Sequence, residues 1–203
     1  PYLGIDLSYM NAYLKMAKED KLKIRINAAL DLFADIKDVT AKRAKAEAEG
    51  NGFYRIPFLK QFVDGVPGNH TAMMLEDYSD RPGEKGGALL DLDKLNDAIE
   101  AAHLHGMSVR LHACGDAAVR AALDGYENAI IRHGRGTSRH QVEHIEVIDP
   151  ADIERFAKAG IMASVQPEHV VSGMPSFADN NYPEILGPEK TKYTWVFRQL
   201  LDT

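Results

Sequence analysis

Short apolar segments alternate with amphipathic segments along the whole chain. The apolar segments predict five strands, at about residues 22–30, 56–65, 109–113, 139–147 and 161–169. Stretches with helical periodicity predict helices near residues 8–21, 39–49, 91–105, 116–132 and 150–159, with a last helix from about residue 189. Strands that alternate with helices in this way predict an α/β fold with parallel pairing.

This alternation is compatible with an open doubly wound sheet or with a (β/α)₈ barrel. A glycine-rich phosphate-binding sequence should follow a strand, but the nearest candidate, GRGTS at Gly134–Ser138, precedes one, which favours the barrel. Five strands are too few to close a barrel. We therefore predict a single domain over residues 1–203 that forms an incomplete barrel. The loop at residues 66–90 is longer than usual, and we expect it to be either functional or disordered.

Composition limits the function classes. Of the 203 residues, 45% are hydrophobic, but no apolar run reaches the roughly 20 residues of a membrane span. A net charge of −6 without a basic stripe argues against nucleic-acid binding. A single cysteine, Cys114, excludes an internal disulfide, and we interpret it as a buried residue rather than a nucleophile. A cytoplasmic location is the default expectation, and Pro1 suggests that the chain begins inside a longer protein.

Metal-capable side chains occur at the ends of the predicted strands. His112 and His144 end successive strands, and Lys60 lies late in an earlier one. Strand alternation lets all three point into a barrel lumen near the carboxyl ends, where barrel enzymes build their active sites. Imidazole is the commonest metal ligand, so the pattern predicts a metal site. The alternative is that each histidine is a core residue with a satisfied hydrogen bond.

Other polar residues surround this predicted site. Asp116 either stabilises the start of a helix or hydrogen-bonds a ligand histidine. Gln166 and His169 follow the last strand on the presumed active face, and His169 is a candidate substrate contact. Glu143 is opposite in parity to His144, so we expect it to face away from the lumen. The remaining histidines are expected to be solvated, namely His70, His103, His105 and His133.

Four ordered motifs, KQFVDG, LHACGDAAV, QVEHIEV and ASVQPEH, resemble the metal-dependent amidohydrolase superfamily, in the branch that includes N-substituted formamide deformylase. The match runs from about residue 22 to the end of the chain. It implies a distorted (β/α)₈ barrel with one or two divalent metal ions, usually zinc. It also implies hydrolysis of an amide-type carbon–nitrogen bond in a small-molecule substrate by a metal-activated water.

The resemblance assigns roles to particular residues. Lys60 would be the fourth-strand lysine, which is carboxylated in some relatives. His112 and His144 would be the metal ligands of the fifth and sixth strands. The residues expected to contact substrate or to hold the ligands in place are Asp64, Asp116, Gln166 and His169.

The sequence also departs from this family. The first-strand His-x-His pair and the final-strand aspartate are absent, and Asp202 lies too early to replace the latter. The accessory β-sandwich is absent too, so the chain corresponds to about the third to seventh strands. We therefore expect the isolated chain to be inactive, with a metal site that can be empty, and to form a homo-oligomer through open sheet edges. The alternatives are a non-catalytic interaction module and a metal-dependent esterase or phosphoesterase.

Overall fold

A computed structural model describes residues 9–171 and 182–203, and its centre is a parallel five-stranded sheet. The strands follow chain order across the sheet, which confirms the predicted α/β class. They are β1 (Ile26–Asp31), β2 (Tyr54–Phe62), β3 (Ser108–Ala113), β4 (Gln141–His144) and β5 (Met162–Ser164). The helices that precede or connect them are α1 (Met10–Lys18), α2 (Ile36–Glu49), α3 (Leu92–Leu104), α4 (Asp116–His133) and α5 (Pro150–Ala159).

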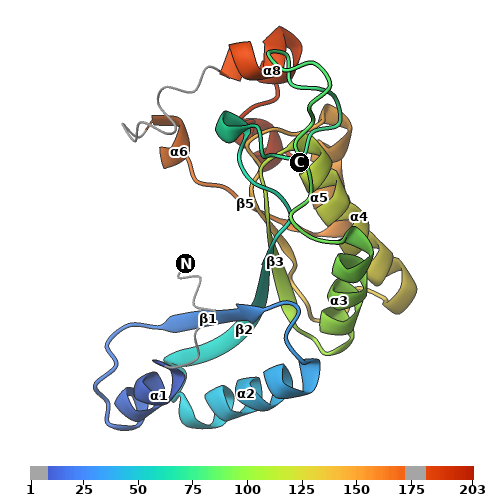
Figure 1. Ribbon diagram of the computed structural model, residues 1–203. Helices are drawn as coiled ribbons and strands as arrows, with labels where there is room; N and C mark the ends of the chain where they lie inside the picture. The colour runs from blue at the N-terminus through green and yellow to red at the C-terminus, as the bar shows by residue number, and fades with distance from the viewer. Residues whose placement is uncertain (1–8, 172–181) are drawn as a thin grey trace.

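The helices cover one face of the curved sheet. In Figure 1, α2 to α5 lie along the outer face, and the opposite, concave face carries none of them. On the outer face, Val109, Leu111 and Val142 are fully buried against the helical layer. Side-chain caps stabilise two of these helices, because the carboxylates of Asp91 and Asp149 accept backbone N–H groups at the starts of α3 and α5.

The strand register sets which side chains share the concave face. In parallel strands, residues paired across the sheet point to the same side. One row aligns Lys60 of β2 with Arg110 of β3 and Gln141 of β4. The next row toward the carboxyl ends aligns Phe62, His112 and Glu143. The polar rows of this face therefore meet at its carboxyl edge.

Strand β4 ends in an unusual backbone conformation. His144 and Ile145 have φ values of 78° and 54°, in the left-handed region that L-residues seldom occupy. The strand alternation stops at this point, so the direction of the His144 side chain is set by a turn and not by the pleat. Backbone strain of this kind clusters at functional sites.

The long loop between β2 and α3 is ordered by contacts at many points. It opens with a short 3₁₀ turn, η2 (Pro67–Asn69). Within the loop, Met74 N–H donates to the carbonyl of Lys85 at 2.8 Å, and the Tyr78 hydroxyl donates to the carbonyl of Ala72 at 2.8 Å. The sequence left open whether this loop is functional or disordered. The structure shows that it is ordered and lies against the carboxyl end of the sheet.

The end of the chain differs from the prediction of one helix from residue 189. After α6 (Glu168–Val171), the structure has α8 (Tyr182–Thr191), interrupted at Gly187 (φ 76°), and a short α9 (Phe197–Leu201). Ser8, at the start of the first predicted helix, lies outside the described residues. None of the helices in the described part of the chain has the length and apolar character to cross a membrane.

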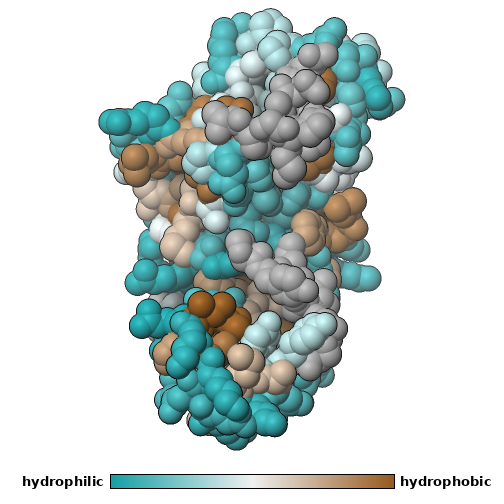
Figure 2. All heavy atoms as spheres, turned by 90° about the vertical axis from the view of Figure 1, so that its left-hand side faces the viewer, coloured by the Kyte–Doolittle hydropathy of each residue, from teal (hydrophilic) through white to brown (hydrophobic). Residues whose placement is uncertain are grey.

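Both edges of the sheet lack a neighbouring strand within the described residues. At the β5 edge, Met162 is 38% exposed, whereas Val142 of the adjacent strand is fully buried. Figure 2 looks onto the concave side of the molecule, where hydrophobic patches are separate and surrounded by hydrophilic surface.

Unpaired edges tend to associate, so we propose that the chain is a dimer or larger assembly at micromolar concentration. Light scattering after size-exclusion chromatography measures this directly. A monomer across that concentration range would contradict the proposal.

Candidate functional site

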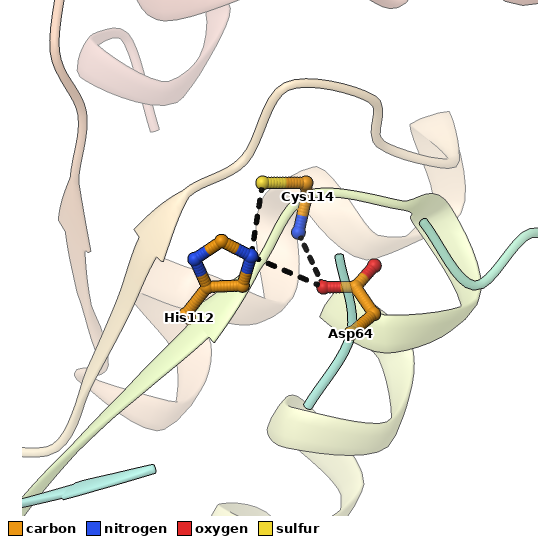
Figure 3. Close-up of side chains that lie close together, drawn as sticks. All are labelled: Asp64, His112 and Cys114. Atoms are coloured by element: carbon orange, nitrogen blue, oxygen red, sulfur yellow. Dashed lines mark hydrogen bonds and ion pairs between the residues drawn. The ribbon is translucent and has the colours of Figure 1, made fainter. Parts of the chain in front are cut away.

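His112 stands at the carboxyl end of β3, on the concave face. One of its nitrogens, Nε2, lies 3.0 Å from the carbonyl oxygen of Gly65 and is therefore the N–H donor of this pair. The other nitrogen, Nδ1, has no hydrogen bond within residues 9–171 and 182–203. Figure 3 shows Nδ1 on the side of the ring away from Asp64 and Cys114. The Gly65 carbonyl thus selects the tautomer that leaves a lone pair on Nδ1.

His144 is arranged in a similar way from β4. Its Nδ1 lies 2.8 Å from Oε1 of Gln166, which leaves Nε2 as the nitrogen with a lone pair when Nδ1 donates. The rings of His112 and His144 meet at 4.5 Å between centroids, with an interplanar angle of 63°. The left-handed backbone at His144 brings its ring to His112 although the two residues are not paired in register. His140 and Val142, which simple alternation along the strand would put on the same side as His144, lie on the outer face.

The two imidazoles are neutral at neutral pH. Burial, followed by the charges of His112 and Lys60, lowers the pKa of His144 to about 4. Burial also lowers the pKa of His112, and Lys60 adds to that effect. Neutral imidazole is the form that binds metal ions.

Lys60 reaches the same area from β2 but is paired with a carboxylate. Its ammonium donates to Oε2 of Glu143, and both side chains are buried. The expectation that Glu143 faces away from the lumen is wrong. Glu143 is in register with His112, while His144 is the residue that departs from alternation. Burial lowers the pKa of Lys60, and the charge of Glu143 opposes this change.

Asp64 follows β2 and lies behind His112 at the edge of the long loop. It is fully buried, and Oδ1 accepts the N–H of Cys114 at 3.0 Å, while Oδ2 accepts those of Gly115 and Met73 at 2.9 Å. Burial raises the pKa of Asp64 to about 7, and the three N–H donors act in the opposite sense. This carboxylate therefore joins β3, the start of α4 and the long loop.

Asp64, His112 and Cys114 form a group of three potential metal ligands whose atoms lie within 4.8 Å of one another (Figure 3). Nε2 of His112 lies 3.4 Å from Sγ of Cys114 and 3.7 Å from Oδ1 of Asp64. Cys114 is buried as predicted, and burial raises the pKa of its thiol. Because Nε2 already faces the Gly65 carbonyl, this side of the ring fits hydrogen bonding better than metal binding.

The remaining predicted residues lie around this centre. Asp116 accepts the N–H of Leu75 at 2.8 Å and lies 3.7 Å from Nζ of Lys190, so it fastens the long loop and has no bond to a histidine within the described residues. His169 stacks on His144 at 5.7 Å, and its Nδ1 lies 3.6 Å from Oε1 of Glu146. Glu146 is a buried carboxylate that the sequence reasoning missed.

Two histidines expected to be solvated are enclosed by protein. His103 is 6% exposed, and its Nδ1 lies 3.0 Å from Nε2 of His140. His70 has a side chain that is only 10% exposed, with Nε2 between the two carboxylate oxygens of Asp80 at 2.9 and 3.0 Å. The partner of His103 is 37 residues away and that of His70 lies ten residues further along the same loop, and the local pattern gives no sign of either.

Similar proteins identify the family of this chain. Residues 4–203 match the model of the amidohydrolase family. The chain is 30% identical, over 97% of its length and 36% of the relative, to the putative amidohydrolase YtcJ of Bacillus subtilis (strain 168). It is 34% identical, over 71% of its length and 24% of the relative, to the protein LONG AFTER FAR-RED 3 of Arabidopsis thaliana. The chain thus spans about a quarter to a third of these relatives.

Solved structures of metal-dependent hydrolases share the fold of this chain. The fold superposes with a TM-score of 0.74 on an uncharacterized metal-dependent hydrolase from Pyrococcus furiosus, with 28% identity over 95% of this chain and 38% of the other. A metal-dependent hydrolase from Pyrococcus horikoshii OT3 gives the same TM-score at 26% identity, over 95% of this chain and 37% of the other. The five-stranded sheet is consistent with an incomplete barrel, as predicted. The chain belongs to the amidohydrolase family.

Proposed function

We propose that this chain carries part of the metal centre of a hydrolase that cleaves non-peptide carbon–nitrogen bonds. The observation that carries the proposal is the pair of imidazoles at the carboxyl end of β3 and β4. Each has one nitrogen against an oxygen atom, Gly65 O for His112 and Gln166 Oε1 for His144, and its other nitrogen available. Oxygen acceptors behind metal-binding histidines fix the tautomer and the ring orientation in this way.

The donor set fits a divalent ion, with zinc as the favoured identity. Two neutral imidazoles with rings 4.5 Å apart are suitable ligands, and they leave other positions for substrate and for residues outside this chain. Lys60 is a third candidate, but its ammonium must lose a proton, or be carboxylated, before it can coordinate. A bound ion of this kind supplies Lewis-acid activation of a carbonyl group and of water.

The chain's own residues supply orientation and a low-dielectric wall. The Gly65 carbonyl holds His112, Gln166 holds His144, and Glu143 balances the charge of Lys60. None of these groups is placed as a general base. We therefore expect the 203-residue chain alone to show no hydrolysis of amide substrates with added zinc, and measurable turnover would contradict this expectation.

Zinc titration calorimetry of the chain tests the metal assignment. Replacing His144 with glutamine should weaken zinc binding at least about tenfold, since it removes one of two neutral imidazole ligands. The matched control is His133→Gln, because His133 is outside the site and pairs with Glu100 at the surface. Equal affinities for His144→Gln and His133→Gln would contradict the assignment. In the complete protein, a panel of amides, esters and phosphoesters separates the proposed reaction from its alternatives.

A further inference from the structure

A second polar region lies at the opposite end of the sheet from His112 and His144. The loop from residue 134 to residue 139 joins α4 to β4 at the amino ends of β4 and β5. Together with the end of α5 and the start of β5, it lines a groove of about 520 Å³. This volume lies within the range of small-molecule sites. The metal-site proposal does not use this groove.

The backbone of the loop presents unused donors. Gly134 and Gly136 have positive φ values of 78° and 58°, which other residues seldom adopt. Between and after them, the N–H groups of Arg135, Gly136, Thr137 and Ser138 have no acceptor among the described residues. Successive N–H groups in a turn of this type form concave sites that bind anions.

Two arginines, Arg135 and Arg139, line the same groove. Among the described residues, neither Arg135 nor Arg139 forms an ion pair, and the groove lining contains no aspartate or glutamate. Two other arginines in this part of the molecule are ion-paired: Arg132 pairs with Glu100, and Arg155 pairs with three carboxylates.

Arg135 is held in a defined position. Its guanidinium lies so close to Gly160 that a Cβ there would come within 1.7 Å of Nη1, and Nη2 donates to the Lys158 carbonyl at 3.4 Å. Capping of α5 accounts for this contact of Arg135. It accounts neither for Arg139 nor for the unused N–H groups.

Ser138 provides an independent observation. Ser138 lines the groove, and its Oγ is buried and has no hydrogen-bond partner in the described structure. Buried hydroxyl groups are nearly always hydrogen-bonded, so this one indicates a partner that the chain does not supply. An oxyanion would accept from this hydroxyl, from the backbone N–H groups and from both guanidiniums.

We propose that the loop at residues 134–139 binds a phosphate-class oxyanion. Four backbone donors, one hydroxyl and two guanidiniums suit a tetrahedral group with several acceptor oxygens. Ile161 and Met162 form an apolar wall beside the loop, which leaves room for an organic substituent on the phosphate. The ligand is therefore inorganic phosphate or a small phosphate monoester.

Two-dimensional NMR of the ¹⁵N-labelled full chain tests the proposal, with sodium phosphate titrated at constant ionic strength. We expect saturable shifts of the amides of residues 135–138. Arg139→Gln should weaken binding about tenfold, because it removes a charge-assisted hydrogen bond. Ser138→Ala should weaken it to a smaller extent. Arg132→Gln is the matched control, since Arg132 lies near the end of α4, just before the loop, and is already paired with Glu100, so it should leave the affinity unchanged.

Three results would overturn the proposal: equal shifts with sodium chloride, no saturation below about 20 mM phosphate, or equal loss in Arg132→Gln and Arg139→Gln. A parallel titration with phenyl phosphate distinguishes a phosphate monoester from inorganic phosphate as the ligand. Tighter binding of phenyl phosphate supports a phosphate monoester, and equal binding supports the free ion. Because the groove is remote from the imidazole pair, the outcome is independent of the zinc titrations.

Discussion

Replacing Asp64 with asparagine is expected to lower the free energy of unfolding by about 1–2 kcal/mol at pH 8, as the net of lost hydrogen bonds and of relief from burying a charge. At that pH the carboxyl group, whose pKa burial raises to about 7, is mostly ionised, and the cost of burying its charge offsets part of the stabilisation from its hydrogen bonds. Both oxygens then accept buried N–H groups, from Cys114 on one side and from Gly115 and Met73 on the other.

Asparagine keeps only one acceptor oxygen. Its NH₂ group must face at least one of the backbone N–H groups, so one or two buried donors lose their partner and a donor is set against a donor. Hydrogen bonds to charged groups contribute about 1.5–3 kcal/mol each, and an unsatisfied buried donor adds a desolvation cost. The loss should also loosen Gly65, the residue that orients His112.

Urea unfolding measures the effect, with Asp97→Asn as the matched control. Asp97 is exposed on α3, and the same substitution there should change stability by no more than about 0.5 kcal/mol. If Asp64→Asn were as mild as Asp97→Asn, the carboxylate would not be the junction between β3, α4 and the long loop.

The strand pattern and the strand-end histidines could be predicted from the sequence because they depend on local periodicity. Buried parallel strands are apolar on both faces, so an imidazole at the last position of β3 stands out from its neighbours. The ends of β3 and β4 then had to lie side by side, because consecutive parallel strands usually pair. That reasoning placed His112 and His144 together.

The side-chain directions at the end of β4 differ from strict strand alternation for a physical reason. Alternation holds only while the backbone stays extended, and the positive φ at His144 ends it. The residue that shares the concave face with His112 is Glu143, and Lys60 is consequently an ion-paired side chain. A strained backbone of this kind has no sequence signature when the residues involved are histidine and isoleucine.

Contacts between segments that are distant in the chain could not be predicted from the sequence either. His103 was expected at the surface because it lies near a helix end, yet the loop after α4 covers it, and Gly134 supplies a carbonyl at 2.8 Å from its Nε2. The order of the long loop likewise depends on Asp64, which follows β2, and on Asp116, at the start of α4. Local patterns identify which residues are polar but not which distant groups will meet them.

The buried pair of His103 and His140 leads to the second large effect, a loss of stability in acid. The N–H of Val109 donates to Nδ1 of His140, so the proton of His140 is on Nε2, and it is donated to Nδ1 of His103. Nε2 of His103 then donates to the Gly134 carbonyl. Every nitrogen of the two neutral rings has one role, and an added proton on His140 would have to face the Val109 N–H.

The sign of the pH effect follows from this arrangement. Burial, and next the charge of His103, lowers the pKa of His140 from 6.5 to about 4. The unfolded chain therefore takes up this proton first, and stability is lost as the pH falls from about 6.5 toward 4. The loss at pH 4.5 amounts to about 2.5 kcal/mol relative to pH 8. Asp64, whose pKa is raised, acts in the opposite sense, so the wild-type curve alone does not isolate His140.

Comparing the pH dependence of stability in the wild type and in His140→Gln isolates the contribution of His140. His140→Gln keeps an amide that can accept from Val109 and donate to His103, but it does not titrate. Urea unfolding at pH 8 and at pH 4.5 should show that the wild type loses about 2.5 kcal/mol more than this variant. The control is His105→Gln, the same substitution at an exposed histidine two residues after His103 at the end of α3. Its stability should change with pH as that of the wild type does. If His140→Gln and His105→Gln lost stability equally in acid, the proton of His140 would not be excluded by the fold.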